Sequence, residues 1–218
     1  HFELSTAQKK FGTKSARNYN IDQSYGYHAA NNRFQVGTGA LTVEGWCYPV
    51  GGSDSYAGMV GRWWTDGNIF DVRYQSGDAG GNFSVHDSTS IRNSGVAFST
   101  NTWSHFAWTR DGSGNNALWL NGVQKTTWSN QNSMSLGTKD LLFGVTDSGT
   151  GYHYNGYLDE IRLSTVERYT STFALWYAIL PLRYSSKALY IITLLAIHYS
   201  SFFFPILYFV SSFQFSLS

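Results

Sequence analysis

Short runs of alternating apolar and polar residues, separated by turn residues, make up the chain to about residue 170. Alternation with a period of two is typical of a strand with one buried face, and no stretch here has the period of a helix. Strands that recur about every ten residues indicate an antiparallel sandwich or barrel. The pattern predicts strands at 41–48, 58–63, 69–74, 83–86, 103–110, 117–120, 123–127, 141–145 and 157–163.

Two residue pairs predict hairpin turns. Asp66-Gly67 lies between the second and third predicted strands, and Asn121-Gly122 lies between the sixth and seventh. Asn-Gly favours a type I′ turn, in which both central residues have positive φ. Strand alternation also predicts a buried core, which we expect to include Trp46, Phe106, Trp108, Leu118, Leu120, Leu158 and Ile161.

Residues 174–218 differ in composition from the rest of the chain. They contain no glycine and no acidic residue, and no charged residue follows Lys187. The stretch 188–210 is uncharged and about as long as a membrane span, although Pro205 interrupts it. Three interpretations stay open for this tail: a membrane span, a packed part of the globule, or an artefact of translation beyond a frame change. We expect 174–218 to be dispensable to the fold.

Composition narrows the class of partner. Charged residues are only 13% and aromatic residues 17%, and the net charge is +1. Without a broad electrostatic field we expect no nucleic-acid partner, and a membrane partner only if the tail is genuine. The single Cys47 cannot form an internal disulfide, and its apolar neighbours predict a small buried side chain. The chain begins at His1 rather than Met, so we expect a fragment of a longer protein.

Four segments, in order along the chain, carry a resemblance. They are 11–16 (FGTKSA), 37–49 (ending LTVEGWCYP), 103–123 (WSHFAWTRDG to LWLNGV) and 152–163 (ending GYLDEIRL). Together they resemble the laminin-G-like, concanavalin A-like lectin/glucanase jelly-roll domain. The resemblance implies an all-β, two-sheet antiparallel β-sandwich over residues 1–173, followed by a hydrophobic tail that does not match the family.

The resemblance also implies a type of function. Such domains hold glycans or proteins in extracellular and viral surface proteins, so the leading hypothesis is a carbohydrate-binding or surface-adhesion module of a larger extracellular or virion protein. Its partner would be a glycan or another cell-surface ligand. The alternative is a structural sandwich module that contacts other protein chains.

A glycoside hydrolase is the third hypothesis, and the residues disfavour it. The glucanases of this fold resemble retaining enzymes, which need two carboxylates about 5 Å apart. The four glutamates, Glu3, Glu44, Glu160 and Glu167, have no acidic residue two or four positions away. No nucleophile elbow, phosphate loop or paired-histidine metal motif occurs either. We therefore expect no enzymatic activity.

Calcium is the one cofactor that the resemblance implies. Many relatives hold Ca²⁺ through an aspartate of the closing strand together with backbone carbonyls, and Asp159 occupies that position. The alternative is an ion pair between Asp159 and Arg162 or Arg168. Glu44 with Arg110, and Asp71 with Arg73, are expected to form ordinary cross-strand pairs.

Aromatic residues near loops and strand ends are the candidates for sugar binding, because a sugar ring presents a face of C–H groups that stacks on an aromatic ring. Core or rim packing is the alternative for each. Adjacent Trp63 and Trp64 must point to opposite faces if the chain is extended there. The candidate ligand-binding residues are Tyr56, Trp63, Trp64, Tyr74, Trp128, Tyr152 and Tyr154.

Overall fold

The computed structural model describes residues 2–21, 24–30, 35–62, 70–75, 81–135, 139–147 and 152–175. The contacts within the chain divide it into two units, His1–Tyr177 and Ala178–Ser218, and the second lies outside the described residues. Within the described ranges the regular elements are strands, and none of those residues belongs to a helix that could cross a membrane.

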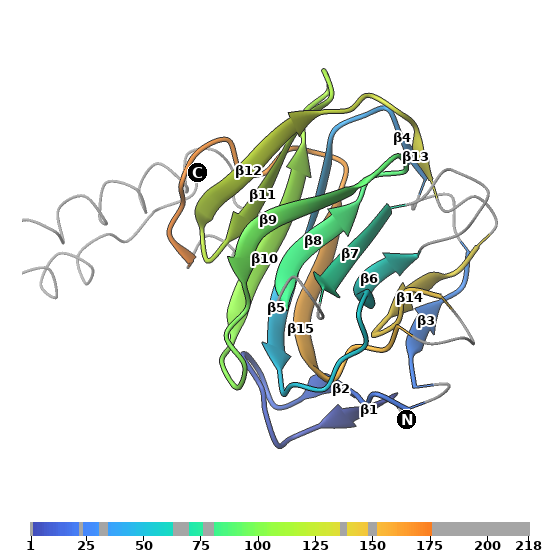
Figure 1. The fold of residues 1–218 in the computed structure, drawn as a ribbon, viewed down its shortest axis with the longest axis vertical. Helices are drawn as coiled ribbons and strands as arrows, with labels where there is room; N and C mark the ends of the chain where they lie inside the picture. The colour runs from blue at the N-terminus through green and yellow to red at the C-terminus, as the bar shows by residue number, and fades with distance from the viewer. Residues whose placement is uncertain are drawn as a thin grey trace, which may run out of the picture. The chain divides into compact units, whose positions relative to one another are not determined.

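Two antiparallel sheets form a sandwich, as the sequence predicts (Figure 1). In spatial order, the seven-stranded sheet contains β1 (Phe2–Ser5), β2 (Ser15–Asn18), β15 (Gly156–Ser164), β5 (Leu41–Pro49), β10 (Ser104–Arg110), β11 (Asn115–Leu120) and β12 (Val123–Ser129). The six-stranded sheet contains β3 (Gly26–His28), β14 (Leu141–Phe143), β6 (Ala57–Arg62), β7 (Phe70–Gln75), β8 (Asn82–His86) and β9 (Ile91–Ala97). A two-stranded ribbon pairs β4 (Gln35–Gly37) with β13 (Met134–Ser135).

Each of the nine predicted strands corresponds to a strand of the structure, within a few residues at its ends. The Asn121-Gly122 pair has positive φ at both residues, as a type I′ turn requires. Strand β9 is one of the strands that were not predicted, because apolar and polar residues do not alternate in its sequence IRNSGVA. It lies at the edge of the six-stranded sheet, where fewer of its side chains face the core.

The predicted core is confirmed for Phe106, Trp108, Leu118, Leu120 and Leu158, all buried between the sheets. Cys47 is also buried there as a free thiol. Two other predictions need correction. Ile161 is only half-buried at the margin of this core. Trp46 is buried, but on the outer face of the seven-stranded sheet.

The alternation of β5 explains the placement of Trp46. Its odd-numbered residues, such as Val43 and Cys47, face the core, so Trp46 must face outward. There its ring contacts Phe11 and His105 edge-on, at centroid distances of 5.8 and 5.3 Å.

The segment 165–175, here named the strap, covers another part of this outer face. Tyr169 and Phe173 of the strap stack on each other at 3.6 Å, and both rings contact Trp119 of β11. The Phe173 amide donates a hydrogen bond of 3.0 Å to the carbonyl of Gly122. The strap therefore gives the seven-stranded sheet a second, smaller apolar cluster on its outer side.

A buried carboxylate, Glu44, anchors the strap by charge. It forms an ion pair with Arg168 at 2.8 Å, lies 3.3 Å from His105 Nε2, and accepts a hydrogen bond from the Tyr169 hydroxyl. Burial alone would raise the pKa of Glu44, but the hydrogen bonds from His105 and Tyr169 and the charge of Arg168 lower it overall.

The expected pair of Glu44 with Arg110 is wrong, because the two residues face opposite sides of the sheet. Arg110 points inward from the end of β10 and is buried. It donates to three backbone carbonyls, those of Gly37, Gly39 and Asn132. Arg110 thus fastens the β4–β13 ribbon over one end of the sandwich.

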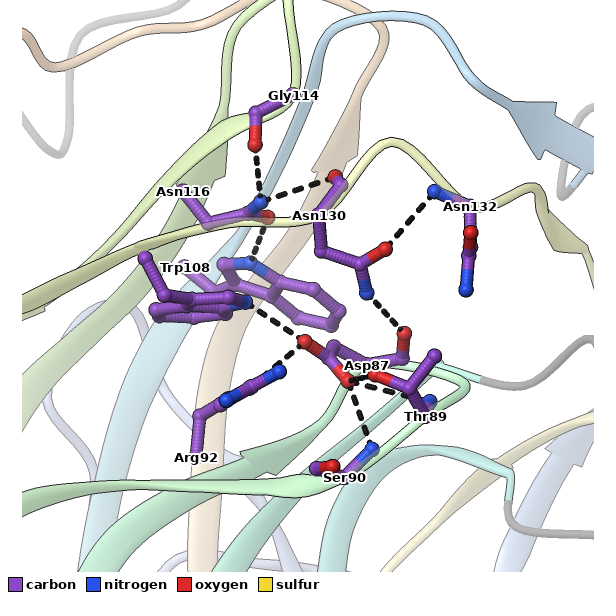
Figure 2. Close-up of polar contacts among 10 residues, drawn as sticks. Asp87, Thr89, Ser90, Arg92, Trp108, Gly114, Asn116, Asn130 and Asn132 are labelled. Carbon is purple, nitrogen blue, oxygen red and sulfur yellow. Dashed lines mark hydrogen bonds and ion pairs between the residues drawn. The ribbon is translucent and has the colours of Figure 1, made fainter.

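Asp87, in the turn after β8, links the two sheets (Figure 2). Its buried carboxylate accepts hydrogen bonds from Trp128 Nε1 of β12 at 2.7 Å and from Arg92 Nε of β9 at 3.0 Å. Thr89 and Ser90 donate to its other oxygen. Burial would raise the pKa of Asp87, but these donors hold it well below its usual range.

We predict that Asp87→Asn lowers the free energy of unfolding by about 1–3 kcal/mol, because it removes charge-assisted hydrogen bonds between the sheets. The stabilisation by the carboxylate is present above about pH 4, the pKa of an unfolded aspartate, and is lost as the pH falls toward the lowered folded-state value. Urea denaturation of wild type and variant between pH 7 and pH 3 measures both effects. The variant should show a flatter pH dependence. Equal slopes would contradict the role given to Asp87.

We predict that Gly122→Ala loosens the strap and costs about 1–2 kcal/mol of stability. Gly122 has φ +78°, and a Cβ there would lie within van der Waals overlap of the Phe173 carbonyl oxygen. The matched control is Gly112→Ala, since a Cβ at Gly112 meets nothing within 4 Å. Thermal melts of both variants test the difference, and equal melting temperatures would refute it.

Candidate functional site

Strand β7 places a buried ion pair on the outer face of the six-stranded sheet. Phe70, Val72 and Tyr74 point into the core, so Asp71 and Arg73 point outward. Arg73 Nε lies 2.6 Å from Asp71 Oδ2, and the two side chains are only 4% and 0% exposed. The sequence predicted a cross-strand pair. The two residues instead pair along one strand.

The strand register brings His86 and Ile91 to the same face. His86 of β8 lies opposite Asp71, and Ile91 of β9 lies opposite His86. Burial and then the charge of Arg73 lower the pKa of His86 to about 4, so the imidazole is uncharged at neutral pH. Its Nδ1 atom is buried and has no hydrogen-bond partner among the described residues.

Two loops build walls beside this face. Tyr56 precedes β6, and Thr146 and Tyr152 lie in the segment between β14 and β15. Thr146 Oγ1 donates to the Tyr56 carbonyl at 2.6 Å, and the Gly58 amide donates to the Tyr152 carbonyl at 3.1 Å. A Cβ at Gly58 would lie 2.4 Å from the carbonyl carbon of Val145, so glycine permits this close approach.

These elements enclose a pocket of about 320 Å³, and its lining residues are Tyr56, Arg73, His86, Ile91, Thr146 and Tyr152. The Tyr56 and Tyr152 rings meet edge-to-face at 5.9 Å and remain 38% and 41% exposed. The pocket therefore combines exposed aromatic rings with a buried guanidinium and an uncharged imidazole. This chemistry suits a ligand with both apolar faces and hydroxyl groups.

The structure separates the aromatic candidates. Tyr152 lines the pocket together with Tyr56. Tyr74 and Tyr154 are buried in the core and present no ring face to a ligand. Trp63 and Trp64 lie outside the described residues.

Trp128 is half-buried at the edge of the core, where it packs against Trp108 and donates to Asp87. Its indole thus joins the two sheets, and Trp128 is not among the residues that line the pocket.

Sequence reasoning missed the polar side of the pocket. The alternation of β7 gives the outward direction of Arg73, but an outward charged residue on a strand ordinarily contacts water. The residues that surround Arg73 in the pocket include Thr146 and Tyr152, which are distant in sequence. His86 carries no local signal of a binding role, because the register that sets it opposite Asp71 is a long-range property.

Asp159 has an anchoring role in the structure. Its Oδ2 accepts hydrogen bonds from the amides of Lys10 and Phe11 at 2.9 and 3.0 Å, and its Oδ1 accepts one from the Glu160 amide. The expected partners Arg162 and Arg168 form ion pairs with Glu44 instead. The described residues contain no group of three or more His, Cys, Asp or Glu placed to hold a metal ion. Calcium binding at Asp159 stays a prediction.

The concanavalin A-like lectin/glucanase superfamily matches residues 22–171. The chain belongs to this superfamily. A search of curated proteins found no match.

Solved structures with the fold of this superfamily include domain 4 of AbnA, a GH43 extracellular arabinanase from Geobacillus stearothermophilus, in complex with arabinotriose. The TM-score is 0.60 at 17% identity, over 77% of this chain and 76% of that chain. The binding domain of Paraclostridial Mosquitocidal Protein 1 has a TM-score of 0.60 at 12% identity, over 77% of this chain and 43% of that chain. The Botulinum Neurotoxin serotype G binding domain has a TM-score of 0.52 at 12% identity, over 88% of this chain and 46% of that chain. At these identities the likeness shows the superfamily fold alone.

We predict that, if Asp159 is a calcium ligand, Ca²⁺ raises the melting temperature, because the ion binds only the folded state. Asp159→Asn should abolish the rise. Since Asp159 also anchors the Lys10–Phe11 turn, the variant is compared with and without Ca²⁺ rather than with wild type. Identical melts of wild type in Ca²⁺ and in EDTA would remove the calcium hypothesis.

Proposed function

We propose that this chain is a non-catalytic carbohydrate-binding module whose ligand occupies the pocket between Tyr56 and Tyr152. The observation that carries the proposal is the pairing of two exposed tyrosine rings with two polar groups, Arg73 and His86, on the buried side of one pocket.

The pocket supplies the two kinds of contact that a sugar needs. The C–H face of the ring packs on Tyr152 or Tyr56, which buries apolar surface on both partners. The hydroxyl groups face the guanidinium of Arg73, which only donates hydrogen bonds, and His86 Nδ1, which has no partner among the described residues. A hydroxyl that bonds to this buried nitrogen would relieve an unsatisfied polar group, which favours the complex.

The family and the structural neighbours support this proposal. Domain 4 of AbnA was solved with arabinotriose, and its fold covers most of this chain. The six pocket-lining residues include no carboxylate, whereas retaining hydrolysis of a glycosidic bond needs two. For this reason the proposal is a binding module rather than an enzyme. An extracellular or virion-surface location stays a prediction of the family resemblance.

A second candidate function is the assembly of protein chains. A groove of about 630 Å³ between β1–β2 and β3 is bordered by Leu4 and Tyr27, which are 69% and 66% exposed. Exposed apolar side chains beside a groove are typical of protein interfaces. Sedimentation of wild type and of Leu4→Asp distinguishes the two functions, since only an interface at this groove predicts that the substitution changes the mass of the particle.

We predict that Tyr152→Ala weakens saccharide binding about tenfold or more, a loss of about 1.4 kcal/mol, because it removes a stacking surface. Binding is found on a glycan array and then measured by titration calorimetry with the oligosaccharides that score. Tyr157→Ala is the matched control, since Tyr157 is a half-buried tyrosine that lines neither the pocket nor the groove. Equal losses in the two variants, or no loss in Tyr152→Ala, would refute the site.

A further inference from the structure

We propose that this pocket selects neutral saccharides over acidic ones, and that Asp71 sets this selectivity by compensating the charge of Arg73. The inference rests on the proposed function and names the ligand class for the same site. Asp71 is a positioning residue here, because it acts on Arg73 and does not line the pocket.

Asp71 balances the charge of Arg73 within a buried pair. Arg73 is the one cationic residue among the six that line the pocket, apart from the titratable His86. Its Nε donates to Asp71 Oδ2 at 2.6 Å, and both side chains are almost fully buried. Because water does not screen this pair, the carboxylate offsets much of the field that Arg73 would otherwise project into the pocket, about half of it for an atom in contact with the guanidinium and more at larger distances.

The other described groups that face Asp71 carry no charge at neutral pH. On β6 its register partner is Gly61, which has no side chain. On β8 it faces His86, which is uncharged at neutral pH. From the loop after β14, the Thr146 hydroxyl lies near Asp71, is neutral and donates its hydrogen bond to the Tyr56 carbonyl. Among the described groups that face Asp71, Arg73 is therefore the one that carries a charge at neutral pH. The charges of Asp71 and Arg73 sum to zero.

A pocket of zero net charge discriminates against an anion. A ligand carboxylate that enters it loses hydration and gains no net counter-charge, and it also meets the negative Asp71 behind the guanidinium. A neutral sugar loses only hydroxyl hydration, which Arg73 and His86 replace with hydrogen bonds. The same geometry without the charge of Asp71 would instead form an anion site, because Arg73 would be uncompensated.

This arrangement makes a prediction for Asp71→Asn, which keeps the shape of the side chain and removes its charge. The ratio of the Kd for an acidic saccharide to the Kd for its neutral counterpart should fall at least tenfold in the variant. A merely structural role would weaken both ligands together and leave the ratio unchanged. Asp111→Asn is the control, because it changes the net charge equally in a turn outside the pocket.

Lowering the pH should lower the Kd ratio of the wild-type protein in the same way. Burial raises the pKa of Asp71 to about 6, so Asp71 takes up a proton as the pH falls from 7.5 to 5.0. Sugar carboxylates, with pKa values of about 3–4 like other carboxyl groups, stay ionised over this range, and His86 stays mostly neutral. The Kd ratio of wild type should therefore fall with pH, while that of Asp71→Asn should stay nearly constant.

The experiment begins with an array that carries neutral oligosaccharides beside their uronic acid counterparts, such as oligogalactosides and oligogalacturonides. Titration calorimetry then measures the Kd of each member of the pairs that bind. The inference is supported if wild type binds the neutral saccharide more tightly at pH 7.5 and the ratio of the acidic to the neutral Kd falls in Asp71→Asn or at pH 5.0. Equal or tighter acidic binding by wild type at pH 7.5 overturns it and leaves the carbohydrate function standing. Binding of neither class overturns both. If Asp71→Asn fails to fold, the pH series on wild type decides.

Discussion

The attachment of one sheet to the other is the constraint on which the rest of this sandwich depends. Hydrogen bonds fix the lateral position of one sheet on the other more strictly than apolar packing alone, because they depend on direction as well as distance. Asp87 fixes β8 and β9 to β12 on one side, with its carboxylate accepting from Trp128. On the other side Asn18 of β2 donates to the carbonyls of Gly144 and Tyr154 at 2.6 and 2.7 Å. These buried polar contacts fix which residues of the two sheets meet.

The second attachment also positions the proposed binding site. Gly144 and Tyr154 border the segment that carries Thr146 and Tyr152, so the Asn18 amide holds both ends of a pocket wall. Asn18 itself belongs to the seven-stranded sheet, on the other side of the core. The site on one sheet is therefore built with support from the other, and a change at Asn18 would reach the pocket without touching the ligand.

The fold could be predicted from the sequence because strand alternation and turn pairs are local. The Asn121-Gly122 turn and the inward direction of Phe106 and Trp108 required no knowledge of the rest of the chain. The positions of Trp46 and Ile161 were exceptions. For Trp46, the side of a strand that faces the core depends on its neighbours, and the contact that Phe11 makes on the opposite face is not visible in the sequence of β5.

The site was predicted only in part for the same reason. Tyr152 was a candidate because an aromatic residue in a loop is a local signal. Its partners Arg73 and His86 carried no such signal, since a buried charge on a strand is recognised only when the segments that bury it are in place. Tyr74 and Tyr154 show the converse, because an aromatic residue near a strand end is as readily part of the core.

The strap has a consequence for the surfaces of the domain that a ligand leaves free. It lies on the outer face of the seven-stranded sheet, while the pocket opens on the outer face of the six-stranded sheet. The strap and the binding surface are thus on opposite sides of the sandwich. A ligand that fills the pocket would leave the strap untouched, so contacts over the strap and contacts at the pocket would not compete for the same surface.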